Sequence, residues 1–514
     1  MMNTCKKILK NEKLLVCAIL VQLLLGCAFT LLVEYGNESN GAFLGNSLHG
    51  VFVQVSGPKS GKNSLPNSYY MFQDVHVMMF IGFGYLLILM KRSDHKSLIS
   101  YFLVTAISLQ WGTLCYGFFR TINGKIHLNI NTLLNADFAC AAVLISCAAV
   151  AELTTPLQIF LMSLLEIILY STNNWIGSLV FQASDVGSSM FVHVFGAYFG
   201  LAVSFVLYRG TAYCAERQSS KDEASNDSIG ETLSTAVGTM FLWLLWPSFN
   251  ACSAKGDAEQ FRAIINTYYS LSASCVTAFA VSSLVFNCFV CAEDNRRRSF
   301  NMVVFQNSTL VGGVVIGTSA DMMINIWGAM IIGGLAGAGS IFINRFSTTK
   351  AVHRIIGMRN AWGVISLHGI PGIVAGFVGA IVSAAATKED YGFSLYRQFP
   401  ARSPLNSSSE FSKIQYYDLK IDPGRERTAL QQAGFQIVTL IVTLVIAIIG
   451  GLVTGTILSL SFFRQPYEEN DSQPDQLTLV VDQLLLSERR LNVIDATSET
   501  NPIVILTDNL SSTC

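Results

Sequence analysis

Long apolar runs separated by short polar connections fill most of the chain. Most of these runs reach the roughly 17 to 25 residues with which an α-helix crosses the hydrocarbon core of a bilayer. The pattern therefore predicts an all-α polytopic membrane protein with about a dozen transmembrane helices. The runs are residues 14–33, 70–90, 98–119, 133–151, 157–170, 188–207, 233–249, 268–291, 303–318, 327–343, 362–385 and 435–463.

The first and last runs have features of their own. The first follows a basic stretch, but its length of 20 residues and its lack of a small polar cleavage site favour a retained helix over a signal peptide. The last run has 29 largely apolar residues. A helix of that length measures about 43 Å, so we expect it to tilt, bend or project from the bilayer.

Composition supports the same class. Of the 514 residues, 51% are hydrophobic and only 13% are charged, against roughly a quarter charged in soluble domains. Lipid is therefore the expected main solvent of this chain. A formal net charge of -1 provides no polybasic surface, which argues against a nucleic-acid partner.

The sequence contains no recognisable catalytic or metal-binding pattern. Cys288 and Cys291 have a CxxC spacing, but no second pair completes a zinc site. A nucleophile and base set is not recognisable either. We therefore expect that the protein is not an enzyme and uses no metal or cofactor.

Basic residues beside the runs indicate the orientation. They fall on alternate loops, which should face the cytoplasm. An even number of helices then leaves both termini cytoplasmic: residues 1–13 precede the transmembrane domain of residues 14–463, and a tail of residues 464–514 follows it. These basic residues are Lys91, Arg92, Lys96, Arg209, Arg217, Lys221, Arg296, Arg297, Arg298, Arg345, Lys350 and Arg354.

Three polar regions lie outside the runs. The sequon Asn37-Glu38-Ser39 falls in the first external loop, where Asn37 can carry a glycan. The external segment 388–427 and the tail after Pro466 are longer and polar. Neither of these two longer stretches is expected to form a packed domain.

Ionisable residues within or beside the runs are few. Inside a membrane such groups are costly unless they face a cavity or meet a partner, so each has a functional and a structural interpretation. They are Asp74, His76, Asp137, Asp185, His193, Asp321 and His368.

Two of these residues, His193 and His368, each head an apolar stretch that contains glycines. They occur in the sixth and eleventh runs, five helices apart, which is the spacing of a five-helix inverted repeat whose equivalent helices meet near the midplane. Two imidazoles in contact would form a mostly neutral, hydrogen-bonded pair that can relay a proton for a small amine. Alternatively, each histidine bonds a carbonyl group on a neighbouring helix.

Asp185 precedes His193 by eight residues. On one continuous helix the two would share a face but lie about 12 Å apart, which excludes direct pairing. A carboxylate at the outer end of that helix can complement the helix dipole or attract a cation to the mouth. It can equally serve as a simple helix cap.

Five segments, in the same order along the chain, resemble motifs of the Rh glycoproteins, a branch of the ammonium transporter family. The resemblance extends from the first run to about Phe463. The segments are Phe72-Gln73-Asp74-Val75-His76-Val77-Met78, Asn135-Ala136-Asp137-Phe138, Phe195-Gly196-Ala197-Tyr198-Phe199-Gly200-Leu201, Trp246-Pro247-Ser248-Phe249-Asn250 and Leu367-His368-Gly369-Ile370-Pro371-Gly372.

The resemblance implies a plasma-membrane homotrimer with one narrow pore per subunit, lined midway by the twin histidines His193 and His368. It assigns Phe138 and Phe249 to the outer phenylalanine gate, although spacing alone would not select these two residues. It matches Asp185 to the family aspartate near the outer mouth. Ammonium would lose a proton near this gate, and neutral ammonia would cross the apolar section. A bare cation in a dry tube faces a large desolvation cost, whereas ammonia faces little.

Some positions depart from the family pattern. The acidic residues associated with the vestibules of conducting members are replaced here by Asn174 outside, and by Thr232, Asn301 and His353 inside. Ser366 replaces an asparagine close to His368. Weaker cation enrichment at the inner mouth and a different orientation of the histidine ring would follow.

Two other functions stay open. The same apolar pore would admit carbon dioxide, so a carbon dioxide channel is one alternative. The second is a nonconducting scaffold that recruits a cytoplasmic partner through its acidic tail. Retention of both histidines argues against the scaffold, because the related blood-group Rh proteins have lost them.

Overall fold

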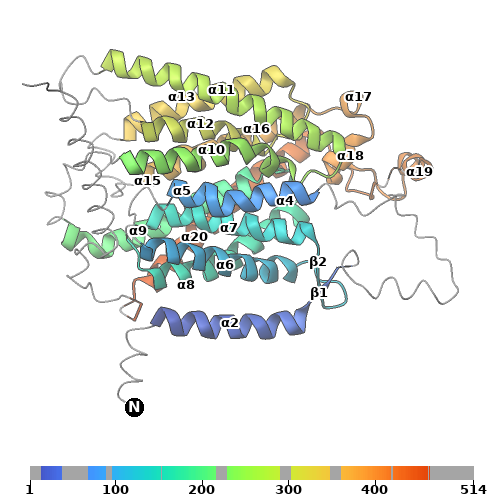
Figure 1. The fold of residues 1–514 in the computed structure, drawn as a ribbon. Helices are drawn as coiled ribbons and strands as arrows, with labels where there is room; N and C mark the ends of the chain where they lie inside the picture. Colours follow the sequence, from blue (N-terminus) through green and yellow to red (C-terminus); the bar gives the residue numbers. More distant parts are fainter. Residues whose placement is uncertain are drawn as a thin grey trace, which may run out of the picture. The chain divides into compact units, whose positions relative to one another are not determined.

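The computed structural model describes residues 13–36, 68–87, 95–151, 153–215, 229–289, 302–347, 361–417, 419, 421–460 and 462–463. Several predictions concern residues outside this set, namely the Asn37 glycan, Cys291 of the CxxC pair, most of the loop charges, the inner vestibule positions Asn301 and His353, and the tail. The described residues form a bundle of long helices (Figure 1). At one end of the bundle lie the strands β1 (Val33–Tyr35) and β2 (Ile126–Leu128) and the short helices α17 (Lys388–Tyr391), α18 (Ser394–Gln398) and α19 (Ser409–Tyr416).

Each predicted apolar run corresponds to a helix or to consecutive helical segments. Among the described residues, 8 helices are long and apolar enough to cross a membrane, and the apolar stretch Val304–Gly317 is shorter. In chain order the segments are α2 (Lys13–Leu32); α4 (Ser68–Val77), η2 (Met78–Gly82) and α5 (Phe83–Leu87); α6 (His95–Phe118); α7 (Ile130–Val150); α8 (Pro156–Trp175) and η3 (Ile176–Val180); η4 (Ser189–Val194) and α9 (Phe195–Ala215); α10 (Ile229–Ala251); α11 (Asp257–Phe289); α12 (Met302–Gly317); α13 (Ile326–Ser347); α15 (Ala361–Val364), η5 (Ile365–Gly369) and α16 (Ile370–Ala385); and α20 (Ala429–Leu458).

The ends of the last helix differ from the prediction. The helix α20 has 30 residues but begins six residues before the predicted run and ends before Phe463. A capping box starts it: the Thr428 side chain accepts from the Gln431 backbone, and the Gln431 side chain accepts from the Thr428 backbone. The first turns are polar and extend the helix beyond its apolar run, so hydropathy alone misplaced this boundary.

The first and last helices share one end of the bundle. The Lys13 Nζ donates a hydrogen bond of 2.8 Å to the carbonyl oxygen of Phe462, so the start of α2 lies beside the chain just after α20. This contact agrees with an even number of crossings.

Packing follows the same order in two halves of the bundle. The helix α6 packs against α7 and α8, and α11 packs against α12 and α13. The helix α20 packs against both α9 and α16, which continue the two histidine-bearing segments. Corresponding helices of the two halves thus make corresponding contacts.

Segment 388–427 corrects a prediction. It was not expected to form a packed domain, but its Tyr391, Phe399, Phe411 and Ile414 are buried in a cluster that includes Met322, from the turn after α12. Its apolar residues follow no long period because short helices and turns present them, so periodicity does not reveal the core. We call the described residues of this segment the cap.

The strands β1 and β2 were not predicted. They form a parallel pair in which Val33 lies opposite Ile126, and each strand has only three residues. The pair ties the end of α2 to the connection between α6 and α7. Three residues are too few for an alternating pattern to be recognised.

Candidate functional site

His193 and His368 meet inside the bundle. Their Nδ1 atoms lie 3.0 Å apart, and their rings stack with centroids 5.0 Å apart and planes 9° from parallel. The side chains are almost fully buried, with residue exposures of 1% and 2%. We call these residues the histidine pair.

Both histidines lie in π-helical segments: η4 begins the helix that α9 continues, and η5 lies between α15 and α16. His193 belongs to η4 and His368 to η5. The segment η4 approaches α16 so closely that a Cβ on Gly372 would lie 2.7 Å from Val194 Cγ2 and 3.0 Å from the Ser189 carbonyl oxygen. Glycine at this position therefore lets the two histidine-bearing segments come together.

The direct bond between the histidines determines what they offer a ligand. With a single proton between the two Nδ1 atoms, one ring donates and the other accepts. In the neutral pair the donor ring has an accepting Nε2, and the acceptor ring has a donating Nε2. The His193 Nε2 is buried and has no hydrogen-bond partner among the described residues. The pair can thus accept from and donate to a small amine.

Aromatic rings pack against the histidine pair. Phe138 and Phe249 form an edge-to-face contact, with centroids 4.8 Å apart at 77°. We call these two residues the phenylalanine pair. Phe249 also lies 5.8 Å from the His193 ring, and Trp246 stacks on His193 at 5.6 Å and 20°. One face of the histidine pair is therefore lined by rings.

The segment 246–250 in α10 supplies several of these contacts. Pro247 lies inside the helix, where it cannot donate a backbone hydrogen bond. Ser248 donates to Asp74 Oδ2 at 2.5 Å, and Asn250 donates to the Gly313 carbonyl oxygen at 3.0 Å. Polar side chains thus fix the helix on either side of Phe249.

Asp185 lies before the helix that carries His193, where a helix cap was one of its two predicted roles. The continuous helix from Asp185 to His193 was wrong, because the helix begins at Ser189 after Ser188 in the left-handed region, with φ 54°. Asp185 Oδ2 accepts from the backbone N–H groups of Met190 and Phe191 at 2.9 and 3.0 Å, and Oδ1 accepts from Thr318 at 2.6 Å. The carboxylate therefore caps the segment that carries His193.

Asp185 lies between two membrane spans, Pro156–Val180 and Ser189–Tyr208. Burial raises the pKa of its carboxyl group to about 6, and the hydrogen bonds from Thr318 and from the η4 backbone oppose that rise. The same hydrogen bonds that anchor η4 thus also favour the charged form.

The other predicted polar residues do not join the histidine pair. His76 Nδ1 lies 2.9 Å from Asp137 Oδ1, Asp74 accepts from Ser248, and Asp321 lies in the turn between α12 and α13. The Asp321 carbonyl oxygen accepts from Arg262 Nε at 2.7 Å. Burial raises the pKa of the Asp321 carboxyl group to about 7.

Glu166 was missed by the sequence analysis. It lies within α8, is fully buried, and its Oε1 is 2.5 Å from the hydroxyl of Ser146, which also bonds the Gly196 carbonyl oxygen at 2.8 Å. Gly196 follows His193 by three residues. An acidic residue within an apolar run was the available signal.

Two departures from the family pattern can be placed. The Asn174 side chain, at the position where the family has an acid, accepts from Arg120 at 3.1 Å, so a cation lies beside this position. The Ser366 hydroxyl donates to the Gly363 carbonyl oxygen at 3.3 Å, within its own helical turn.

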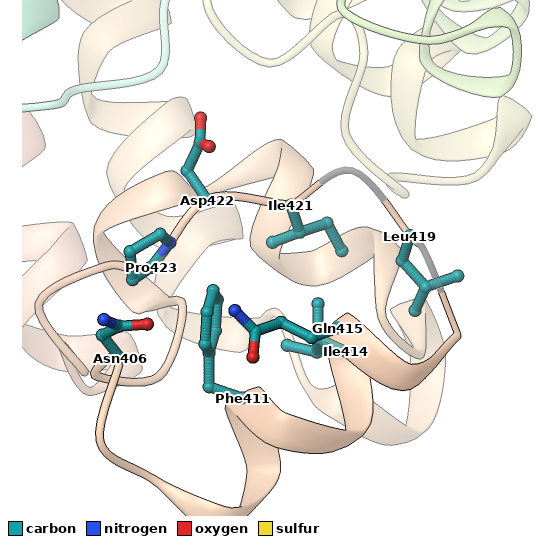
Figure 2. A pocket seen from close by; sticks show the side chains of 8 residues that line it. All are labelled: Asn406, Phe411, Ile414, Gln415, Leu419, Ile421, Asp422 and Pro423. Atoms are coloured by element: carbon teal, nitrogen blue, oxygen red, sulfur yellow. The ribbon is translucent and has the colours of Figure 1, made fainter. Parts of the chain in front are cut away.

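A pocket lies in the cap (Figure 2). No group of three or more His, Cys, Asp or Glu residues suited to a metal occurs in the described part of the chain. The pocket is lined by Asn406, Phe411, Ile414, Gln415, Leu419, Ile421, Asp422 and Pro423.

An apolar helix bundle with a polar pair buried among its rings defines a polytopic membrane protein with a site inside the bundle. The model of the ammonium transporter family matches residues 43–478. The chain belongs to this family, and to its Rh branch. The family consists of transporters and channels, so the chain is not an enzyme.

Relatives resemble the chain over most of its length. Ammonium transporter Rh type B of Xenopus tropicalis is 39% identical over 456 residues, covering 88% of this chain and 90% of that protein. The Mus musculus protein of the same name is 38% identical over 445 residues, covering 85% and 87%.

Two solved structures share the fold. Nitrosomonas europaea Rh50 aligns with a TM-score of 0.57 and 23% identity, covering 83% of this chain and 97% of that one. Saccharomyces cerevisiae Mep2 aligns with a TM-score of 0.58 and 17% identity, covering 80% and 90%.

Proposed function

We propose that this protein conducts ammonia and ammonium across the plasma membrane through a pore inside each subunit. Ammonium gives up its proton to solvent water at the outer mouth, near the phenylalanine pair. Neutral ammonia passes the histidine pair and takes up a proton from water on the other side. Membership of the ammonium transporter family supports this substrate. The observation that carries the mechanism is the contact between His193 and His368 at 3.0 Å, buried beside aromatic rings.

Electrostatics favours passage of the neutral molecule. A bare cation would lose its hydration among the rings of Phe138, Phe249 and Trp246, whereas ammonia loses little. Ammonia still needs hydrogen-bond partners in an apolar passage, and the Nε2 atoms of a neutral histidine pair supply one acceptor and one donor. Two charged imidazoles 3.0 Å apart would repel each other, which supports a pair that stays mostly neutral.

Asp185 has a supporting role in this proposal. Its carboxylate lies at the N-terminus of η4, where it holds the segment that carries His193 and adds negative charge near the outer mouth. The guanidinium group of Arg120 donates a hydrogen bond to Asn174, and its positive charge opposes the enrichment of ammonium at the outer mouth. Asp185 would therefore contribute more to attracting the cation than the outer vestibule does.

The assembly and its sidedness are part of the proposal. We place both termini in the cytoplasm and the cap outside, with a glycan at Asn37 and three subunits in the complex. The contact between Lys13 and Phe462 supports termini on the same side of the membrane, since it joins the start of the first helix to the end of the last one. The tail after Pro466 can recruit a cytoplasmic partner in addition to, rather than instead of, conduction.

Stopped-flow measurement of lumenal pH in proteoliposomes tests the proposal. After an ammonium pulse, entering ammonia takes up protons, so we expect faster alkalinisation with the native protein than in empty vesicles. The double variant His193→Ala/His368→Ala should slow the protein-dependent rate by at least about tenfold, because it removes the acceptor and donor inside the passage.

A matched control removes another histidine. His127→Ala in β2 changes a partly exposed ring outside the histidine pair and should leave the rate unchanged. A native protein that is folded but no faster than empty vesicles would refute ammonia conduction. Carbon dioxide flux, measured in the same vesicles as acidification, then decides between a gas channel and a nonconducting scaffold.

A further inference from the structure

The helix α4 contacts both helices that carry the phenylalanine pair. Phe138 belongs to α7 and Phe249 to α10, and α4 packs against each of them. Figure 1 shows α4 beside α7 and α10. Two polar residues of α4, Asp74 and His76, contact α10 and α7 respectively.

The first contact holds α10. Ser248 donates from its hydroxyl to Asp74 Oδ2 at 2.5 Å. Ser248 is the residue directly before Phe249, and both lie within one helical turn of Pro247. A change in this hydrogen bond therefore acts on the backbone next to the Phe249 ring.

The second contact holds α7. His76 Nδ1 lies 2.9 Å from Asp137 Oδ1, and Asp137 is the residue directly before Phe138. The Asp137 carboxyl group is fully buried, and its second oxygen, Oδ2, has no hydrogen-bond partner among the described residues. The His76 ring is held in turn by Phe72, stacked at 5.4 Å, and by the edge of Phe80 at 5.0 Å.

Helix geometry explains why one helix can hold both neighbours. Residues two apart on an α-helix point about 200° away from each other, so Asp74 and His76 face opposite sides of α4. Farther along, a Cβ on Gly82 would lie 2.6 Å from Leu242 Cδ2, and one on Gly238 would lie 2.5 Å from the Leu86 backbone nitrogen. These close approaches fix α4, η2 and α5 along α10 at a second point.

We propose that Asp74 and His76 are positioning residues that set the spacing between Phe138 and Phe249, and thereby the size of molecule that passes between them. The inference rests on the proposed conduction of ammonia. Neither residue is assigned a contact with the substrate. Both act through the residue that precedes a ring of the phenylalanine pair, so their removal should change selectivity by size rather than conduction alone.

The test compares methylamine with ammonia in proteoliposomes, because the two amines differ by one methyl group. Two variants remove the contacts: Ser248→Ala breaks the bond to Asp74, and His76→Phe/Asp137→Leu replaces both partners of the second contact with apolar groups. We expect the ratio of methylamine to ammonia flux to rise by about tenfold, since a methyl group is discriminated by 10-fold or more in a fitted site.

Conservative variants separate positioning from simple loss of stability. Asp74→Asn and Asp137→Asn keep an oxygen that accepts from Ser248 or His76, so they should retain the native flux ratio. Ser272→Ala on α11 is the control for removing a membrane serine, because that hydroxyl bonds only the Tyr268 carbonyl oxygen of its own helix in the described structure.

Three outcomes are informative. A raised ratio in the two contact-breaking variants, with native ratios in the conservative ones, supports the inference. Ammonia conduction by the native protein with an unchanged ratio in folded Ser248→Ala and His76→Phe/Asp137→Leu overturns it while leaving the proposed function intact. A native protein that conducts neither amine overturns both.

Discussion

The phenylalanine and histidine pairs are buried in the bundle, and the cap has a smaller buried cluster of its own, but the two regions differ in the contacts that fix them. In the middle of the bundle, rings stack on one another and neighbouring helices touch through glycines, as at Gly196, where a Cβ would lie 2.6 Å from the Ala142 carbonyl oxygen. The cap is fixed to the bundle by charged groups, as in the bond from Arg397 Nε to Glu259 Oε1 at 3.0 Å.

The solvent explains this difference. Inside lipid, helices satisfy their own backbone groups, and close packing is the main force that decides how they meet. At the end of the bundle, water hydrates charged side chains, so ion pairs are tolerated and short helices can be connected by turns. Changes in the middle should therefore act through shape, and changes in the cap through charge, pH and salt.

The largest effect should come from a substitution that alters shape. Gly196→Val would push α9 away from α7, because its Cβ meets backbone atoms that cannot turn aside. We expect a loss of about 3 kcal/mol of stability or more, and a displaced His193 three residues earlier. Thermal unfolding in detergent measures the first effect, and ammonium-dependent alkalinisation of proteoliposomes measures the second.

A valine elsewhere in a helix provides the matched control for this substitution. A Cβ on Gly339 in α13 would have no atom within 4 Å, so Gly339→Val tests the β-branched side chain without the clash. Its effect on stability should stay within roughly 0.5 kcal/mol, because valine has a slightly higher helix propensity than glycine. Equal losses in both variants would show that close packing at Gly196 is not what holds these helices.

An intermediate effect is expected in the cap. Glu259 at the start of α11 is buried, with 2% of its side chain exposed, and receives two hydrogen bonds of 3.0 Å from Arg397 in α18. Arg397→Met leaves that carboxylate with Arg262 at 3.8 Å. We expect a cost of about 2 kcal/mol, below the value for a fully buried pair because Arg397 is partly exposed.

Limited proteolysis of the cap and thermal unfolding measure this cost. The double variant Glu259→Leu/Arg397→Met should recover most of it, because no charge is then left buried. Arg425→Met removes a cap arginine that bonds the Val180 carbonyl oxygen at an exposed position, and it should have little effect. A double variant as unstable as the single one would contradict a role for the ion pair.

The two regions also differ in what could be predicted from the sequence. The helices of the bundle were predictable because lipid requires long apolar runs, and their length is nearly set by the bilayer. The cap was not, because Phe399, Phe411 and Ile414 become neighbours through turns and short helices that leave no period. The start of α20 was missed for a related reason, since its first turn is polar.

The site shows the same limit at the level of single residues. The two histidines could be selected as ionisable groups in apolar runs, but their 3.0 Å contact depends on how η4 and η5 meet. The distance from Asp185 to His193 was derived for one continuous helix, but Ser188 adopts a left-handed conformation that ends such a helix. This conformation is not predictable from a serine in the sequence. Glu166 could have been identified in the same way as the histidines, because it is also an ionisable residue within an apolar run.

The smallest effect should involve the surface pair Lys388 and Glu410. The ammonium group of Lys388 and, at 2.6 Å, the hydroxyl of Tyr396 hold the pKa of the Glu410 carboxyl group below its usual value. A lowered folded-state pKa contributes stability above the unfolded value of about 4.3, and this contribution is lost as pH falls through the folded-state pKa.

The substitution Lys388→Met should cost less than about 1 kcal/mol of stability, and this cost should become smaller as salt is added. It should also reduce the loss of stability on acidification. Hydrogen exchange of the α19 amides, corrected for intrinsic rates and compared with α20, measures it. Glu389→Gln, a neighbouring acid in α17, should keep the native pH dependence; equal behaviour of the two variants would exclude Lys388 as the cause.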